Sequence, residues 1–118
     1  MIEALIRRVL ALSPQVRYVA VYWDGVLQSR EREGLSDATS SESDRYEELL
    51  VNPTLLKLAT QRGNIDCGGL RFLIVGYGNF YQIVGALPRG HLSVAVELSA
   101  DPIRVASQLQ KVVEETMP

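Results

Sequence analysis

The chain has 118 residues, of which 47% are apolar, and this predicts a single domain, residues 1–118, built around a hydrophobic core. Its 12 basic and 14 acidic residues give a formal net charge of −2, so there is no broad positive field and we expect no nucleic-acid partner. The one cysteine, Cys67, cannot form a disulfide within the chain, which favours a cytoplasmic protein held together by packing.

The beginning of the chain does not have the pattern of a signal peptide. Arg7 and Arg8 lie inside the first apolar stretch and not before it. The longest apolar runs, around residues 19–23 and 72–75, are far shorter than the roughly 20 residues that a membrane-spanning helix needs. We therefore expect no insertion into a membrane.

A helix and a hairpin are predicted first. Residues 2–10 carry apolar side chains at spacings of three and four, which predicts an amphipathic helix that ends before Pro14. Residues 16–23 are rich in valine and aromatic residues, as is typical of a strand, and the Asp-Gly pair that follows favours a tight turn. Residues 26–32 are mainly polar, which indicates a solvated strand at the edge of a sheet.

A loop and an interrupted helix are predicted next. Residues 34–43 lack periodicity and are rich in turn formers, so we expect an exposed loop. Asp44, with a glutamate three residues later, resembles a capping box and predicts that a helix starts there. Because proline is tolerated best in the first turn of a helix, Asn52-Pro53 predicts a break, after which a second, leucine-rich helix runs to Gly63.

Three strands and a helix complete the chain. Residues 70–77, 80–87 and 91–98 are predicted strands, and the short turns between them demand antiparallel neighbours. Runs of successive apolar residues indicate that helices cover both faces of the sheet. Asp101 and Pro102 are typical of the cap and the first turn of a final helix.

The sequence contains no catalytic, cofactor-binding or metal-binding signature. The Gly-Tyr-Gly at residues 76–78 follows a strand as a dinucleotide-binding loop would, but its third glycine is missing and no helix follows, so we expect a hairpin turn. His91 is the only histidine and is predicted to be a solvated turn residue without a metal. Cys67 has no base near it in the sequence and is expected to be a small residue at a junction between loop and strand.

Two further interpretations concern acidic and aromatic residues. The carboxylates at the start of the middle helix are expected to support that start, because acids there face the positive end of the helix dipole; they are Glu42, Asp44, Glu47 and Glu48. Trp23 ends a predicted strand, and its position is equally consistent with a plug in the core and with an anchor for a partner.

The order of these elements resembles the Roadblock/LC7 family, relatives of the longin-type domains. The resemblance covers nearly the whole chain and rests on IEALIRRVL, on the VYWDG hairpin in YVAVYWDGVLQSR, on the three apolar strands and on the Asp-Pro start of the last helix. The polar loop and the Asn-Pro pair depart from the family pattern. The resemblance implies an α+β fold with a five-stranded antiparallel sheet in the order 2-1-5-4-3, the middle helix on one face and the terminal helices on the other.

The resemblance also implies a function without enzymatic activity or cofactor. Such a protein would form homodimers by pairing the third strand of each copy, and would be a scaffold or regulator of a small Ras-like GTPase or of a related signalling or motor complex. The residues agree with a dimer, because an apolar strand at residues 70–77 would otherwise be a bare edge. The predicted dimer interface combines leucines of the middle helix with the third strand: Leu49, Leu55, Leu56, Leu58, Leu70, Arg71, Phe72, Leu73, Ile74 and Val75.

The alternative prediction is a small-molecule-binding sensory domain, since longin-like and profilin-like sheets are architecturally close to sensory folds. Such a domain would need an enclosed apolar cavity of about several hundred cubic ångströms between the sheet and a helix.

Overall fold

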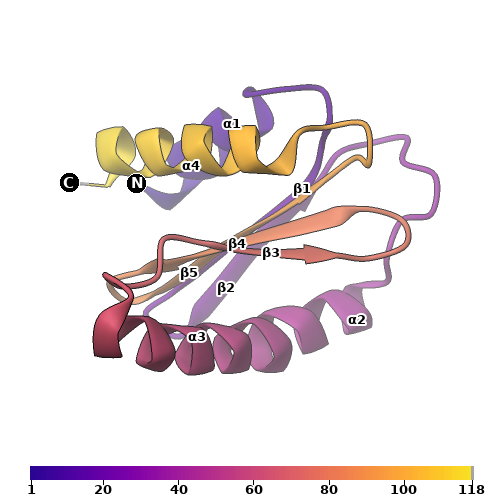
Figure 1. The fold of residues 1–118 in the computed structure, drawn as a ribbon. Coiled ribbons are helices and arrows are strands. Elements are labelled where there is room, and N and C mark those ends of the chain that lie inside the picture. The colour runs from indigo at the N-terminus through magenta and orange to yellow at the C-terminus, as the bar shows by residue number, and fades with distance from the viewer. Residues whose placement is uncertain (118) are drawn as a thin grey trace.

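A five-stranded sheet lies between two layers of helix (Figure 1). The structure, a computed structural model, describes residues 1–117. In chain order its elements are α1 (Ile2–Leu10), β1 (Val16–Trp23), β2 (Val26–Glu31), α2 (Ser41–Tyr46), the π-helical turn η1 (Glu47–Val51), α3 (Asn52–Asp66), β3 (Leu73–Gly76), β4 (Tyr81–Leu87), β5 (Gly90–Val96) and α4 (Pro102–Thr116). None of the helices in residues 1–117 has the length and apolar character needed to cross a membrane.

The sheet is antiparallel throughout, in the order β2-β1-β5-β4-β3. In the middle of the sheet, Ala20 of β1 lies opposite Ser29 of β2 on one side and Ser93 of β5 on the other. At one edge, β3 pairs with β4, with Ile74 opposite Ile83. The predicted fold class and strand order are therefore confirmed.

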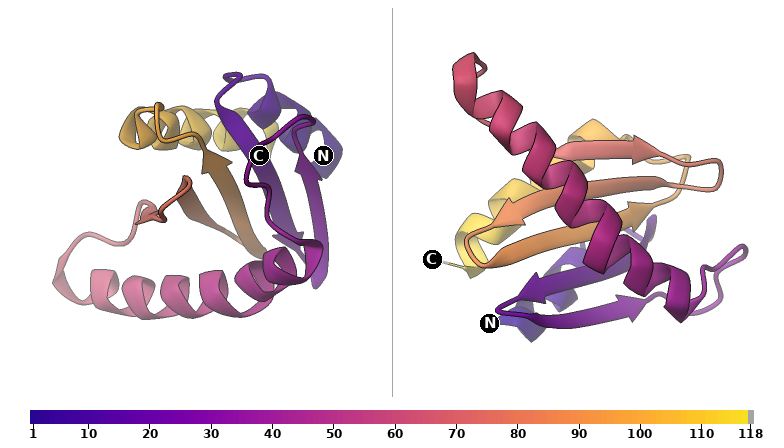
Figure 2. Two further views of the ribbon diagram at one scale, coloured as in Figure 1. Left: turned by 90° about the vertical axis from the view of Figure 1, so that its right-hand side faces the viewer. Right: turned by 90° about the horizontal axis from the view of Figure 1, so that it is seen from below.

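The helices cover the two faces unequally. α1 and α4 lie side by side on one face, and the long middle helix crosses the other face diagonally (Figure 2). The main core lies under α1 and α4, where fully buried side chains such as Leu5 and Val9 of α1 pack with Val94 of β5. Each such side chain contributes about 1.5–3 kcal/mol through burial. Trp23 packs at the border of this core and is partly buried, so it is a core plug in the single chain.

The final helix begins as predicted. The Asp101 carboxylate accepts the backbone N–H groups of Ile103 and Arg104, at 3.1 and 3.3 Å, and Pro102 occupies the first turn. These contacts satisfy two N–H groups that have no partner within the helix.

The predicted start of the middle helix was wrong. The helix begins at Ser41, because the Ser40 hydroxyl accepts the backbone N–H of Ser43 and is the N-cap. Asp44 lies one turn further along, where it accepts a hydrogen bond from Thr39. A serine-rich segment offers several possible caps, and the sequence alone did not single out the correct one.

The predicted break at Asn52-Pro53 was also wrong. Pro53 has no N–H to donate and crowds the preceding turn, and the chain accommodates it by widening that turn into the π-helical η1. Asn52 has helical dihedral angles (φ −62°, ψ −46°) and turns its side chain into the protein. The helix also passes the predicted stop at Gly63 and ends at Asp66. Gly63 is required for packing, since a Cβ there would lie 3.0 Å from the carbonyl carbon of Gly69.

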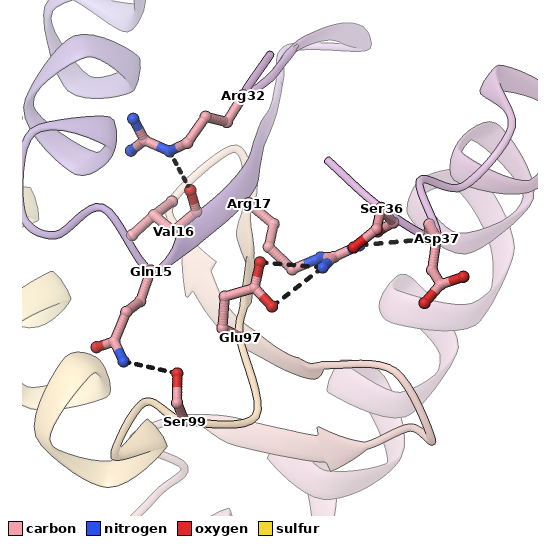
Figure 3. A network of polar contacts seen from close by, with 8 residues as sticks. All are labelled: Gln15, Val16, Arg17, Arg32, Ser36, Asp37, Glu97 and Ser99. Carbon is pink, nitrogen blue, oxygen red and sulfur yellow. Dashed lines mark hydrogen bonds and ion pairs between the residues drawn. The ribbon is translucent and has the colours of Figure 1, made fainter. Parts of the chain in front are cut away.

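The loop between β2 and α2 is tied to the sheet by Arg17 (Figure 3). The Arg17 guanidinium contacts both carboxylate oxygens of Glu97 at 3.1 Å, and it donates to the backbone carbonyls of Ser36 and Asp37 at 3.0 and 3.2 Å. The same figure shows two neighbouring hydrogen bonds, from Gln15 to Ser99 and from Arg32 to the Val16 carbonyl. This network positions the entry to the middle helix.

Candidate functional site

The two edges of the sheet differ in chemistry. β2 is largely exposed and polar, and Arg30 on it pairs with Glu3 of α1 at 2.7 Å. β3 carries Leu73, Ile74 and Val75, all half-buried, and its only strand neighbour among residues 1–117 is β4. An apolar edge whose N–H and C=O groups lack a strand partner favours pairing with another chain.

The middle helix exposes a row of apolar side chains. Val51, Leu55, Leu58 and Ile65 recur at spacings of four, three and seven, which places them on one side of the helix. We call these four residues the apolar flank; Leu58 and Ile65 are 62% and 75% exposed. The C-terminal half of α3 crosses the sheet at its β3 edge and projects beyond it (Figure 2). Ile65 of the flank belongs to this half of the helix.

The predicted interface residues fall into three groups. Leu49, Leu55 and Leu58 are exposed on the middle helix, as an interface requires. Leu56 is 7% exposed and buried in the single chain, so its inclusion was wrong. A step of one residue turns about 100° around a helix, so Leu56 faces the sheet although its neighbour Leu55 is exposed. The strand begins only at Leu73, and the segment Leu70, Arg71 and Phe72 precedes it, with Phe72 packed against the main core.

A buried polar cluster joins the middle helix to the sheet. Glu48 of η1 is fully buried, and its Oε1 lies 2.8 Å from Nε2 of His91. Asn52 donates to the same oxygen at 2.8 Å and to the Ser93 hydroxyl at 3.2 Å, and Gln82 also contacts Ser93. The expectations that His91 is solvated and that Glu48 supports the helix start were therefore wrong. Both side chains instead fix the helix on the sheet.

The side chains of this cluster are almost completely shielded from solvent. His91 is 2% exposed and stacks on Tyr22, with ring centroids 5.7 Å apart. Burial, and after it the negative charge of Glu48, raises the pKa of the nearby Tyr18 hydroxyl. One sequence signal was available, the four-residue spacing of Glu48 and Asn52. Their partners lie more than 40 residues away in the chain, so the pairing could not be identified.

An acidic and aromatic hollow opens next to the β3–β4 turn. Its lining includes Asp44, Tyr46, Glu47, Tyr77 and Phe80, which we call the acidic pocket, and its volume is about 390 Å³. The Tyr77 hydroxyl lies 3.1 Å from both carboxylate oxygens of Glu47. Burial, followed by the charge of Glu47, raises the pKa of Tyr77 to about 12, and burial is also the main cause that raises the pKa of Glu47. The pocket therefore suits a positively charged group.

The remaining sequence-based predictions concern residues without a shared site. The Gly-Tyr-Gly at 76–78 forms the turn into β4, as predicted. Cys67 is exposed just after α3. Within residues 1–117, no group of three or more His, Cys, Asp or Glu side chains is placed to hold a metal ion.

Solved structures share this fold at low sequence identity. A Roadblock/LC7 domain from Streptomyces avermitilis has a TM-score of 0.73 and 16% identity, over 97% of this chain and 92% of that chain. MglC from Myxococcus xanthus has a TM-score of 0.61 and 11% identity, over 96% and 93%. MglB with a tetrameric arrangement has a TM-score of 0.63 and 11% identity, over 94% and 86%. No protein-family profile and no curated protein sequence matches the chain. The chain thus has the Roadblock/LC7-like fold, as the sequence predicted.

Proposed function

We propose that this chain is a non-enzymatic interaction module that forms a homodimer through β3 and the apolar flank. The observations that carry the proposal are the apolar β3 edge, which has no second strand partner among residues 1–117, and the exposed apolar side chains of the middle helix. Leu58 and Ile65 lie open to solvent there, while the opposite edge of the sheet is polar.

The geometry of a two-fold dimer uses both parts of this surface. Two β3 strands that pair antiparallel continue one sheet, and the two-fold axis then runs perpendicular to the sheet. Such an axis keeps both α3 helices on the same face, side by side. The apolar flanks of the two copies then face each other and lose their contact with water together.

The proposed partner of the dimer is a small Ras-like GTPase or another protein of a signalling or motor complex. The support is the Roadblock/LC7-like fold over nearly the full chain and the buried state of the polar cluster, which leaves Glu48 and His91 to hold the fold and not to react. The dimer would scaffold or regulate this partner in the cytoplasm without turning over a substrate itself.

A small-molecule sensor is less well supported. The apolar cleft between α4 and the sheet, lined by residues such as Phe72 and Leu109, has a volume of about 170 Å³. Ligand sites enclose about 300–1,000 Å³. The cleft falls short of that range. Two larger hollows, of about 390 Å³ at the acidic pocket and about 370 Å³ between α3 and the sheet beside Leu56 and His91, are open to solvent and are not the enclosed cavity that a sensor needs, which favours the interaction module.

Affinity capture followed by direct binding tests the proposal. The tagged chain is used as bait in its native cell extract, and any GTPase retained is purified and titrated, loaded with GTP or GDP, against the untagged chain. We expect saturable binding that depends on the bound nucleotide. If the dimeric chain binds no GTPase in either nucleotide state, the proposed partner class is wrong, even if the dimer exists.

A further inference from the structure

Unpaired charges of opposite sign lie near the two ends of β3. Beyond its C-terminal end, Asp44 and Glu47 line the acidic pocket, and neither has a cationic partner among residues 1–117. Before its N-terminal end, Arg71 is exposed and likewise has no ion-pair partner in this part of the chain. Its guanidinium lies 5.3 Å from the centroid of the neighbouring Phe72 ring.

We propose that the acidic pocket of one copy receives the Arg71 guanidinium of a second copy, so that two equivalent Arg71–Glu47 ion pairs close the ends of the β3 junction. This inference rests on the homodimer proposed above and names the contact that fixes its register. The occupant of the pocket is therefore a second copy of this chain.

The alternation of side chains between the two faces of the sheet limits the registers in which two β3 strands can pair. Directly opposite residues in an antiparallel pair lie on the same face of the sheet, and neighbours along a strand alternate between faces. A symmetric pairing must therefore be centred on a residue, and the centres that keep most of β3 paired are Ile74 and Val75.

Both registers bring Arg71 to the pocket. Centred on Ile74, the pairing places Arg71 opposite the second copy's Tyr77; centred on Val75, it places Arg71 opposite the second copy's Asn79. The Tyr77 side chain points to the α3 face, because its hydroxyl reaches Glu47. In the single chain Arg71 precedes the strand and lies beside Phe72 at the cleft under α4. Extending the β3 pairing to residue 71 would turn its side chain to the α3 face, where the acidic pocket opens, with Cβ atoms about 4.5–5.5 Å apart in the first register.

The groups that line the acidic pocket can bind a guanidinium. Glu47 is held by the Tyr77 hydroxyl at 3.1 Å and can accept two N–H groups from a planar guanidinium. The Tyr77 ring adds aromatic surface on which a guanidinium can stack, whereas the Phe80 ring, 5.5 Å from it, already lies under the chain's own Arg17 guanidinium at 5.6 Å. Burial and the nearby Glu48 and Asp44 charges make an ionised Glu47 unfavourable in the single chain, and a cation would relieve this.

A charge exchange tests the pair. The dimer dissociation constant is measured by sedimentation velocity for the unaltered chain, for Arg71→Glu, for Glu47→Arg and for the chain that carries both. Each single change places like charges together at both ends of the junction, and we expect it to weaken association at least about tenfold. The double change restores opposite charges, and we expect a dissociation constant within about threefold of the unaltered value.

Matched controls carry the same charge changes away from the junction. Arg104→Glu, at an exposed position of α4, and Glu33→Arg, at an exposed position just after β2 on the opposite edge of the sheet, should leave the dissociation constant unchanged. Circular dichroism reports whether each variant folds. If a charge reversal unfolds the chain, Arg71→Met and Glu47→Gln replace it, and the variant with both neutral residues should then bind no more weakly than either single one, because one change already breaks the pair.

The outcomes separate this inference from the dimer itself. A dimer that tolerates both single changes, or a double change that recovers nothing, overturns the Arg71–Glu47 pair and leaves the dimer standing. An unaltered chain that is monomeric at all concentrations overturns both.

Discussion

Two neighbouring leucines of α3 should respond in opposite ways to the same substitution. Leu58 is 62% exposed and belongs to the apolar flank, whereas Leu56 is 7% exposed and packs inside the single chain. Full burial of a leucine side chain stabilises by about 1.5–3 kcal/mol, so burying the exposed part of Leu58 in a dimer contributes about 1–2 kcal/mol per copy. Two copies give about 2–4 kcal/mol, which corresponds to a loss of about 30-fold to several hundredfold in affinity for Leu58→Glu.

Leu56→Glu should instead unfold the chain. Removing a buried leucine costs about 2–5 kcal/mol, and an unpaired carboxylate in its place adds a desolvation penalty. Native domains are stable by only about 5–15 kcal/mol, so little folded protein should remain.

Urea unfolding and sedimentation velocity measure the two effects separately. The free energy of unfolding is determined at protein concentrations where the dimer is dissociated, because association would otherwise stabilise the folded state by mass action. Leu58→Glu should keep this free energy within about 1 kcal/mol of the unaltered chain and lose the dimer. Equal destabilisation by both substitutions, or a Leu58→Glu dimer of unchanged affinity, would refute the assignment of Leu58 to an interface.

Three further predictions concern the cluster, a turn and pH. Glu48→Ala should lower the free energy of unfolding by about 3–5 kcal/mol, because it leaves the buried histidine without its partner; calorimetry showing a loss below about 1 kcal/mol would contradict this. Gly90→Ala should destabilise by about 1–3 kcal/mol or more, since its Cβ would lie 1.7 Å from the Tyr22 carbonyl oxygen; an unchanged melting temperature would be the contrary result. The pKa of Glu47 is raised in the single chain, chiefly by burial, and pairing with Arg71 would lower it in the dimer. Association should therefore be strongest above the single-chain pKa of Glu47 and weaken as the pH falls from that value to the lower pKa of Glu47 in the dimer; Glu47→Gln should abolish this dependence, and a pH response that survives in that variant must come from another group.

The sheet could be predicted because its signals are local. The apolar run of β1, the Asp-Gly turn after it and the Asp101-Pro102 start of α4 each specify structure within a few residues. Short connections then force β3, β4 and β5 to be antiparallel neighbours.

The middle helix and its contacts depend on distant residues and were predicted less well. In the sequence, Pro53 predicts a break in the helix. The helix continues only because the turn before Pro53 is π-helical. The sequence predicts that Glu48 and His91 are surface residues. Their contact joins residues that are 43 positions apart, and such a contact leaves no local pattern in the sequence. The sequence does not distinguish Leu56 from the neighbouring leucines, since the packing of α3 against the sheet decides which of them is buried.

Sedimentation velocity of the unaltered chain at micromolar concentration tests the central claim most directly. The apolar edge of β3 and the exposed flank of α3 predict a dimer under these conditions, with dissociation on dilution. A chain that sediments as a monomer throughout the micromolar range would contradict the proposed dimer and the module built on it.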